Sequence, residues 1–257
     1  ADPIIVPPDV RKMLLTAKAY AEGGRALATW CALLLDQAEH HPDDKVRQDS
    51  EEMVALLTPI VKAFLTDNGF AATNACMQVY GGHGYIHETG AEQFVRDARI
   101  NMIYEGTNTV QALDLLGRKV LMNQGATLKK LGKQIEALMR EEGVSEPMAE
   151  FINPLAGLAD KFAKFTTEIG FKGMTNPDEV GAAATDFLRV AGHMVFGYLF
   201  ARMASVALKQ IAAGNTDPFY AAKLQTARFY FARLFPETAS LMITARAGAA
   251  NLLDTEA

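Results

Sequence analysis

The amino-acid sequence predicts an all-α protein, a helical bundle followed by a second helical unit. Apolar residues recur every three or four positions along most of the chain, which is the spacing that places them on one face of a helix. Glycine, proline and short polar clusters separate these stretches. No alternating apolar and polar run of useful length predicts a strand, and the sequence has no internal repeat and no low-complexity segment.

The helices of the predicted bundle lie in residues 1–122. The first is long and amphipathic, and it starts after Pro7 and Pro8 and ends at a His-His-Pro-Asp-Asp run. Further helices are expected over residues 47–70, 73–80, 91–103 and 110–122, with a weak point at the Asp-Asn-Gly run 67–69 and a break at glycines 81, 82 and 84.

Residues 123–257 form the predicted helical extension. A charged amphipathic helix covers 128–140, and after a break at 142–147 another helix continues to about residue 171. A loop at 173–177 precedes a long apolar helix that ends near Gly214, and Pro218 and Pro236 introduce two more helices. The aromatic residues and methionines between positions 194 and 231 are expected to form core rather than a cofactor site.

Composition limits the class of protein. The chain has 257 residues, of which 49% are hydrophobic, enough for one large domain or two ordinary ones. Its net charge of −5 and interspersed charges argue against a nucleic-acid surface. No apolar run approaches the roughly 20 residues that span a bilayer, and the first residues do not resemble a signal peptide. We therefore expect a soluble, cytoplasmic protein with neither a nucleic-acid partner nor a membrane span.

Cysteine and histidine positions predict neither a disulfide framework nor a metal site. Cys31 and Cys76 fall far apart within helical patterns, which fits reduced, buried thiols in a reducing compartment. His83 and His87 have a spacing that could suggest metal ligation, but no third ligand is evident and loop histidines are the better interpretation. The charged run 96–99 is expected to be an ion-paired helix face rather than a guide for a CoA phosphate.

The segment IYEGTNTVQ, which begins at Ile103, interrupts the helical pattern. A glutamate beside a glycine is by itself typical of a solvated turn. Here Ile103 and Tyr104 predict apolar surroundings that would raise the pKa of the Glu105 carboxylate toward that of a general base. Gly106 allows a ligand to approach the backbone, and residues 107–109 open a helix whose free N–H groups favour an anion such as phosphate.

A second segment, QVYGGHGY, begins at Gln78. Three glycines in four positions remove side chains where two backbones, or a backbone and a cofactor, must meet. The segment follows a helical pattern rather than a strand, so it is not a dinucleotide-binding fingerprint.

In order, spacing and identity, these two segments resemble the C-terminal helical domain of the flavin-dependent acyl-CoA dehydrogenases over residues 8–122. The resemblance implies an FAD cofactor, an acyl-CoA substrate, an electron-transfer flavoprotein or other acceptor, and a homodimer or homotetramer. It also implies oxidation to the trans-2-enoyl-CoA, in which a base removes an α-proton while the β-carbon passes a hydride to FAD.

The resemblance assigns a role to each matching position of IYEGTNTVQ. Glu105 corresponds to the catalytic base, and its backbone N–H to a donor for the thioester carbonyl, where negative charge develops. A turn suits this second role, because an N–H in mid-helix would already be bonded. Tyr104 and Gly106 are the implied substrate-binding residues, and Thr107 matches a position that contacts the FAD diphosphate in the same subunit.

The remaining implied FAD contacts divide between the two segments. Thr109 falls where the family often has glutamine, so a polar FAD contact there departs from the usual pattern. Gln78, Gly81 and Gly82 match positions that reach the adenine-nucleotide part of FAD in a neighbouring subunit. A complete flavin site is therefore expected only in an oligomer.

The chain also departs from the family. The N-terminal helical domain, the central β domain and the first bundle helix are absent, so we expect a C-terminal part that exposes an apolar face, holds FAD poorly and is inactive alone. The extension resembles larger members, including those acting on 3-methylmercaptopropionyl-CoA. Two alternatives are a family relative with a nucleic-acid-binding or stress-response role and a structural helical module without activity.

Overall fold

The computed structural model describes residues 2–143 and 145–254, and the regular structure in these ranges is entirely helical, which confirms the all-α prediction. The α-helices are α1 Pro8–His40, α2 Asp44–Val79, α3 Gly82–Tyr85, α4 Ala91–Ile100, α5 Asn108–Leu113, α6 Ala126–Glu142, α7 Ala149–Thr175, α8 Asp178–Ala212, α9 Pro218–Arg233, α10 Glu237–Arg246 and α11 Ala250–Leu253. Short 3₁₀ segments cover His87–Thr89 and Glu146–Met148, and a π-helical segment, η2, covers Asp114–Leu121.

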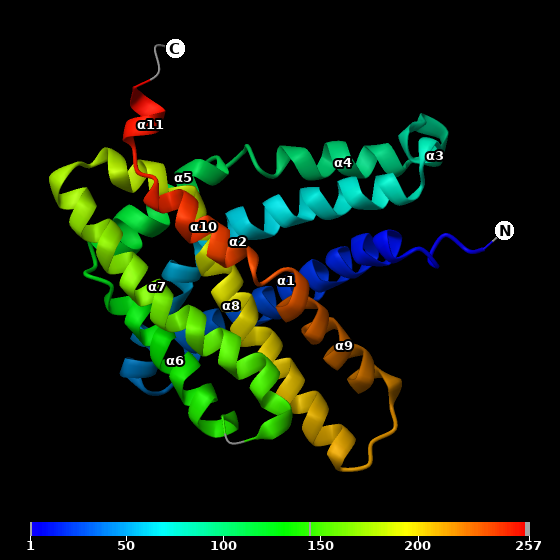
Figure 1. Ribbon diagram of the computed structural model, residues 1–257. Helices are drawn as coiled ribbons and strands as arrows, with labels where there is room; N and C mark the ends of the chain where they lie inside the picture. The colour runs from blue at the N-terminus through cyan, green and yellow to red at the C-terminus, as the bar shows by residue number, and fades with distance from the viewer. Residues whose placement is uncertain (1, 144, 255–257) are drawn as a thin grey trace.

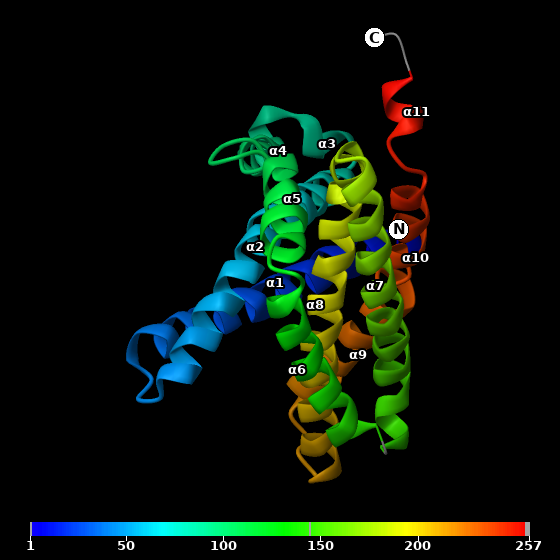
Figure 2. The ribbon, with the colours of Figure 1, turned by 90° about the vertical axis from the view of Figure 1, so that its left-hand side faces the viewer.

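Helices α1 and α2 form a long antiparallel hairpin whose tip projects from the rest of the protein (Figure 2). Proline in the first turn starts α1, where its missing N–H costs nothing. Asp43 caps α2 by accepting a hydrogen bond from the backbone N–H of Lys45 at 2.8 Å. The hairpin matters for the site because α2 is the platform on which the later segments pack.

The predicted weak point at residues 67–69 is wrong, and so is the division into helices 47–70 and 73–80, because α2 runs unbroken to Val79. Its polar residues at this point bond to distant parts of the chain rather than to the local backbone. Asp67 accepts from Asn108 at 2.6 Å, and Asn68 accepts from Arg189 at 3.2 Å. With these partners, the side chains no longer compete with the helix for its own hydrogen bonds.

After α2 the chain reverses and returns as α4, which runs beside the second half of α2 (Figure 1). Gly81 makes the turn with φ +61°, and α3 then packs so closely on the end of α2 that a Cβ at Gly84 would lie 2.2 Å from the Met77 carbonyl oxygen. Helix α4 ends at Ile100, three residues before the predicted end. The chain then passes through turns to α5.

Helix α8 is the centre of the fold and packs against α1, α2, α5, α7, α9 and α10 (Figures 1 and 2). Glycines permit its closest approaches to the hairpin. A Cβ at Gly192 would lie 2.4 Å from the Phe64 ring on α2, and one at Gly23 on α1 would lie 2.5 Å from the Phe196 ring. The rings thus fill the space that side chains would otherwise need.

One continuous hydrophobic cluster joins both halves of the chain, from Leu27 and Phe64 to Phe187 and Tyr230. The division at residues 122 and 123 therefore stays a prediction, since the two parts share their core. The predicted core role of the later aromatic residues and methionines is confirmed: Met194, Phe196, Phe200 and Phe231 are buried, and Met203 and Tyr220 pack against them.

Within the described ranges, α8 is long and apolar enough by length and composition to cross a membrane. Its apolar run is longer than the sequence led us to expect. In this fold 83% of its most apolar 18-residue window is buried inside the protein, as in the core helix of a globular domain.

Candidate functional site

Glu105 lies in the turn between α4 and α5 with an unusual backbone conformation. Its φ of +55° and the φ of +85° at Gly106 place both residues in the left-handed region. A residue other than glycine is uncommon there and persists only where its surroundings hold it, and such positions concentrate at functional sites. A φ of +85° favours glycine at position 106, and a Cβ there would also press on the flexible Gln111 side chain, 3.1 Å from its Nε2.

The turn presents unpaired hydrogen-bond donors. Gln111 donates from Nε2 to the Glu105 carbonyl at 3.3 Å. The Thr107 hydroxyl oxygen caps α5 by accepting from the backbone N–H of Val110 at 3.4 Å, which leaves its own hydrogen free to donate. Four backbone N–H groups have no acceptor among the described residues: those of Glu105, Gly106, Thr107 and Thr109.

The expectation that Ile103 and Tyr104 surround Glu105 with apolar groups is wrong for this chain. Glu105 is exposed, and the two neighbours are 47% and 50% exposed. Helix α4 packs mainly against α2, α3 and the His87–Thr89 segment, which leaves much of its surface uncovered. Six large apolar residues between α4 and α5 are exposed: Phe94, Ile100, Ile103, Tyr104, Val110 and Leu113.

Asn108 anchors the turn to the middle of α2. It accepts from Nζ of Lys62 at 2.7 Å, and its amide nitrogen donates to Oδ1 of Asp67 at 2.6 Å and to the Ala63 carbonyl at 3.3 Å. The sequence predicted free N–H groups over residues 107–109, which is wrong at Asn108, because its N–H donates to the Met102 carbonyl at 3.2 Å. The side-chain bonds of Asn108 and Gln111 were not predicted. No sequence signal identified the anchor, because the partners of Asn108 lie far earlier in the chain.

Burial raises the pKa of the Asp67 carboxyl at this anchor. The hydrogen bond from Asn108 and the nearby positive charges of Arg189 and Lys62 act in the opposite direction. Asp67 is therefore a carboxyl whose environment is set jointly by the turn and by a helix from the far half of the chain.

Gln78, Gly81 and Gly82 lie at the far end of α2, where all three are exposed. A Cβ at either glycine would meet nothing in the chain, so this surface is open to a partner molecule. About 12 residues of helix, roughly 18 Å, separate Asp67 from Val79 at that end. The structure therefore does not bring the two predicted segments together within one chain (Figure 1).

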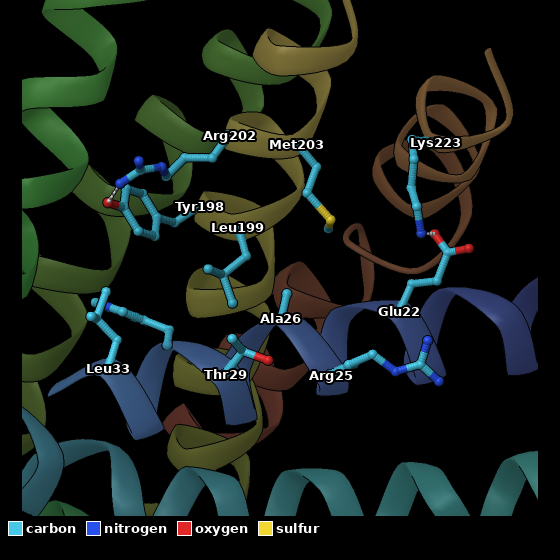
Figure 3. Close-up of a pocket in the computed structure, with 11 residues that line it drawn as sticks. Glu22, Arg25, Ala26, Thr29, Leu33, Tyr198, Leu199, Arg202, Met203 and Lys223 are labelled. Atoms are coloured by element: carbon cyan, nitrogen blue, oxygen red, sulfur yellow. Dashed lines mark hydrogen bonds and ion pairs between the residues drawn. The ribbon is translucent and has the colours of Figure 1, made fainter. Parts of the chain in front are cut away.

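A groove of about 590 Å³ lies between α1, α8 and α9 (Figure 3). Trp30 and Tyr198 pack in it with ring centroids 5.6 Å apart, and Nζ of Lys223 pairs with Glu22 at 3.0 Å. None of its lining residues belongs to either predicted segment. The groove is thus separate from the candidate site.

The other singled-out residues have local contacts. His87 lies 3.3 Å from a carboxylate oxygen of Glu92, and in residues 2–143 and 145–254 no group of three His, Cys, Asp or Glu residues could hold a metal ion. The predicted ion-paired face at 96–99 is wrong. Asp97 instead accepts from Gln93 at 2.7 Å, and the Arg99 guanidinium lies 5.9 Å from the Phe70 ring centroid.

The sequence of this chain matches two family profiles. The C-terminal domain of acyl-CoA dehydrogenases matches residues 1–121, and the family described as "Acetyl-CoA dehydrogenase C-terminal like" matches residues 128–256. The chain belongs to the acyl-CoA dehydrogenase family.

Curated family members align with nearly the whole chain. The 3-methylmercaptopropionyl-CoA dehydrogenase of Ruegeria pomeroyi is 38% identical over 92% of the chain. A broad-specificity linear acyl-CoA dehydrogenase of Mycobacterium tuberculosis is 30% identical over 89% of it. The aligned part makes up 40% and 39% of these relatives, so the chain spans about two fifths of their length.

Solved acyl-CoA dehydrogenase structures share the fold. ACDH-11 of Caenorhabditis elegans, determined with C11-CoA, superposes with a TM-score of 0.69 at 17% identity, over 93% of this chain and 39% of that one. An FAD complex of an acyl-CoA dehydrogenase from Bacillus anthracis gives a TM-score of 0.64 at 18% identity, over 93% and 42% of the two chains. At these identities the likeness concerns the fold alone.

Proposed function

We propose that this chain supplies the catalytic base of an FAD-dependent acyl-CoA dehydrogenase that forms a trans-2-enoyl-CoA, and that Glu105 is this base. The observation that carries the proposal is the backbone of Glu105 and Gly106, which is held in the left-handed region beside unpaired N–H groups. A left-handed backbone at a residue other than glycine costs free energy, and an ordinary solvated turn would avoid that cost. Its presence at Glu105 therefore supports a functional role.

The two polar groups of Glu105 divide the work on the substrate. The carboxylate takes the α-proton of the thioester as that C–H bond breaks. The backbone N–H, which has no acceptor in the described chain, donates to the thioester carbonyl oxygen, where the enolate charge develops. FAD, when bound, supplies the acceptor for the hydride that leaves the β-carbon. Proton and hydride loss together leave the carbon–carbon double bond of the product.

The residues near the turn fit a cofactor that carries phosphate and carbonyl acceptors. The Thr107 hydroxyl and the N–H groups of Thr107 and Thr109 are free donors at the start of α5. They would hold the FAD diphosphate within the same subunit. The open surface at Gln78, Gly81 and Gly82 would receive the adenine-nucleotide part of FAD from a neighbouring subunit, which requires a homodimer or homotetramer.

The rest of the flavin site would come from polypeptide outside these 257 residues, because the chain spans about two fifths of its relatives' length. The same polypeptide, or a second subunit, would cover the exposed apolar residues between Phe94 and Leu113 and so enclose Glu105. The chain by itself would then be inactive. An electron-transfer flavoprotein or another acceptor would reoxidise the flavin.

The test is dye reduction by the full-length, FAD-loaded protein with a panel of acyl-CoA thioesters. Glu105→Gln removes the base and should lower kcat by about 10²- to 10⁴-fold. The control is Glu51→Gln, which changes an exposed glutamate at the start of α2, away from the turn. Equal turnover in wild type and Glu105→Gln would refute the assignment of the base.

A further inference from the structure

We propose that Arg189, on α8 in the C-terminal half of the chain, is a positioning residue that holds the Glu105 turn in place through α2. Its catalytic consequence rests on the proposed function, whereas its structural consequence does not. The path has three steps: Arg189 to Asn68, the adjacent Asp67 to Asn108, and Asn108 to the turn.

The first step joins the two halves of the chain. Nη1 of Arg189 donates to Oδ1 of Asn68 at 3.2 Å, and the guanidinium lies 5.8 Å from the Phe64 ring centroid on the same helix. Asn68 is 2% exposed, and its amide nitrogen has no acceptor among the described residues. A buried amide with an unpaired donor is costly, so its bond to Arg189 is the feature that accounts for an asparagine here.

The second step runs along about two turns of α2. Asn108 bonds to Lys62, Ala63, Thr66 and Asp67, and the last of these is adjacent to Asn68. The stretch 62–68 therefore has the Glu105 turn bound on one side and Arg189 on the other. In the third step, the backbone N–H of Asn108 donates to the Met102 carbonyl, on the other side of Glu105, at 3.2 Å. A shift of the stretch 62–68 would therefore move the turn.

A cluster outside this path fixes Arg189 itself. Its Nε and Nη2 donate to the two carboxylate oxygens of Glu237 on α10 at 2.8 and 2.9 Å. Glu237 also lies 2.9 Å from Nε2 of His193, whose Nδ1 lies 2.9 Å from the Tyr230 hydroxyl. His193 is fully buried. The cluster of residues from α8, α9 and α10 therefore holds the guanidinium in the orientation from which it bonds to Asn68.

The structural readout is amide exchange, followed by NMR in the 257-residue chain. The N–H groups of Tyr104 and Gln111 flank Glu105 and are bonded to the carbonyls of Ile100 and Thr107. Asn68→Ala removes a bond worth about 1 kcal/mol and should speed both exchange rates by about 5-fold. Asn108→Ala should speed them by about 10-fold or more. The double variant should exchange no faster than Asn108→Ala, because the path is already broken.

A matched pair of substitutions separates positioning from general loosening. Arg189→Lys keeps the charge but loses the fork that reaches Glu237 and Asn68 together, so exchange at Tyr104 and Gln111 should rise. Arg228→Lys changes another arginine–glutamate pair, with Glu150 at 2.8 Å, in which neither residue lies on α2, and should leave both rates unchanged. Unchanged rates in Asn68→Ala, or additive rates in the double variant, would overturn the proposal.

The catalytic readout uses the full-length, FAD-loaded protein. Asn68→Ala should lower kcat by about 3- to 10-fold with KM within about 2-fold, because the base is displaced while the substrate still binds. Faster exchange with an unchanged kcat would refute the catalytic consequence. Activity that survives Glu105→Gln would instead refute the proposed function and leave the exchange result standing, so the two failures are distinguishable.

Discussion

Replacing Glu237 by glutamine tests the contribution of the Arg189–Glu237–His193 cluster to stability. The carboxylate accepts two hydrogen bonds from Arg189 and one from His193. Burial alone would raise the pKa of Glu237, but these hydrogen bonds and the charge of Arg189 lower it to about 2. Glutamine keeps the shape and can still accept one bond, so the substitution removes mainly the charge.

The expected cost follows from what remains. Breaking a buried ion pair by removing one partner costs about 3–5 kcal/mol, because the other charge stays buried. The Arg189 side chain is 27% exposed and that of Glu237 is 36% exposed, so water screens part of the effect. We therefore expect Glu237→Gln to lower the free energy of unfolding by about 2 kcal/mol at pH 7.

The same substitution should change the acid dependence of stability. A carboxylate with a lowered pKa stabilises the fold fully above its ordinary pKa of 4.5, and this contribution is lost as the pH falls toward 2. Burial lowers the pKa of His193, so charging this imidazole also destabilises the fold on acidification. Between pH 4.5 and 2, the wild type should lose more stability than Glu237→Gln.

Urea unfolding at a series of pH values measures both effects. Arg228→Lys serves as the control, because its ion pair is on the surface and should cost less than about 1 kcal/mol. A Glu237→Gln protein within about 0.5 kcal/mol of wild type at pH 7, with the same acid profile, would show that the cluster does not stabilise the fold as described.

Three other substitutions or reactions test separate features of the structure. Gly192→Ala places a methyl group 2.4 Å from the Phe64 ring and should cost about 1–3 kcal/mol in urea unfolding, whereas no cost would mean that α2 and α8 are farther apart. Gly106→Ala should cost about 1–2 kcal/mol at a φ of +85°, and an unchanged stability would argue against the left-handed turn. Burial raises the pKa of the Cys31 thiol to about 11, so its alkylation by iodoacetamide should be slow at pH 8 and accelerate toward pH 11. Mass spectrometry of the modified peptide follows this rate, and fast alkylation at pH 8 would contradict the burial.

Much of the fold could be predicted from the sequence because local signals agreed with the tertiary structure. Apolar spacing located the long helices, and the prolines at 8 and 218 mark the first turns of α1 and α9. The prediction failed at 67–69 because Asp67 and Asn68 bond to residues far away in the chain. Spacing also gave no sign that Asp114–Leu121 is π-helical. Helix α7 continues to Thr175, past the predicted end near residue 171, and so shortens the predicted loop. Tertiary packing can outweigh local propensity in this way.

The residues of the candidate site could be predicted as a sequence motif, but the tertiary contacts that hold them could not. Glu105 and Gly106 were found because their residue types interrupt a helical pattern. The anchor at Asn108 could not be found, since its partners at Lys62 and Asp67 lie more than 40 positions earlier. The role of Arg189 could not be predicted either, because an arginine within an apolar helix does not reveal which residue it bonds.

The most direct test of the central claim is α-carbon deuterium exchange. A 3-thia-acyl-CoA, in which sulfur replaces the β-carbon, has an α-proton to lose but cannot pass a hydride from that position. The full-length, FAD-loaded wild-type protein should incorporate deuterium from D₂O at its α-carbon. Glu105→Gln should slow this exchange by about 10²- to 10⁴-fold, while Glu51→Gln should match wild type. Equal exchange by wild type and Glu105→Gln would contradict the assignment of Glu105 as the base.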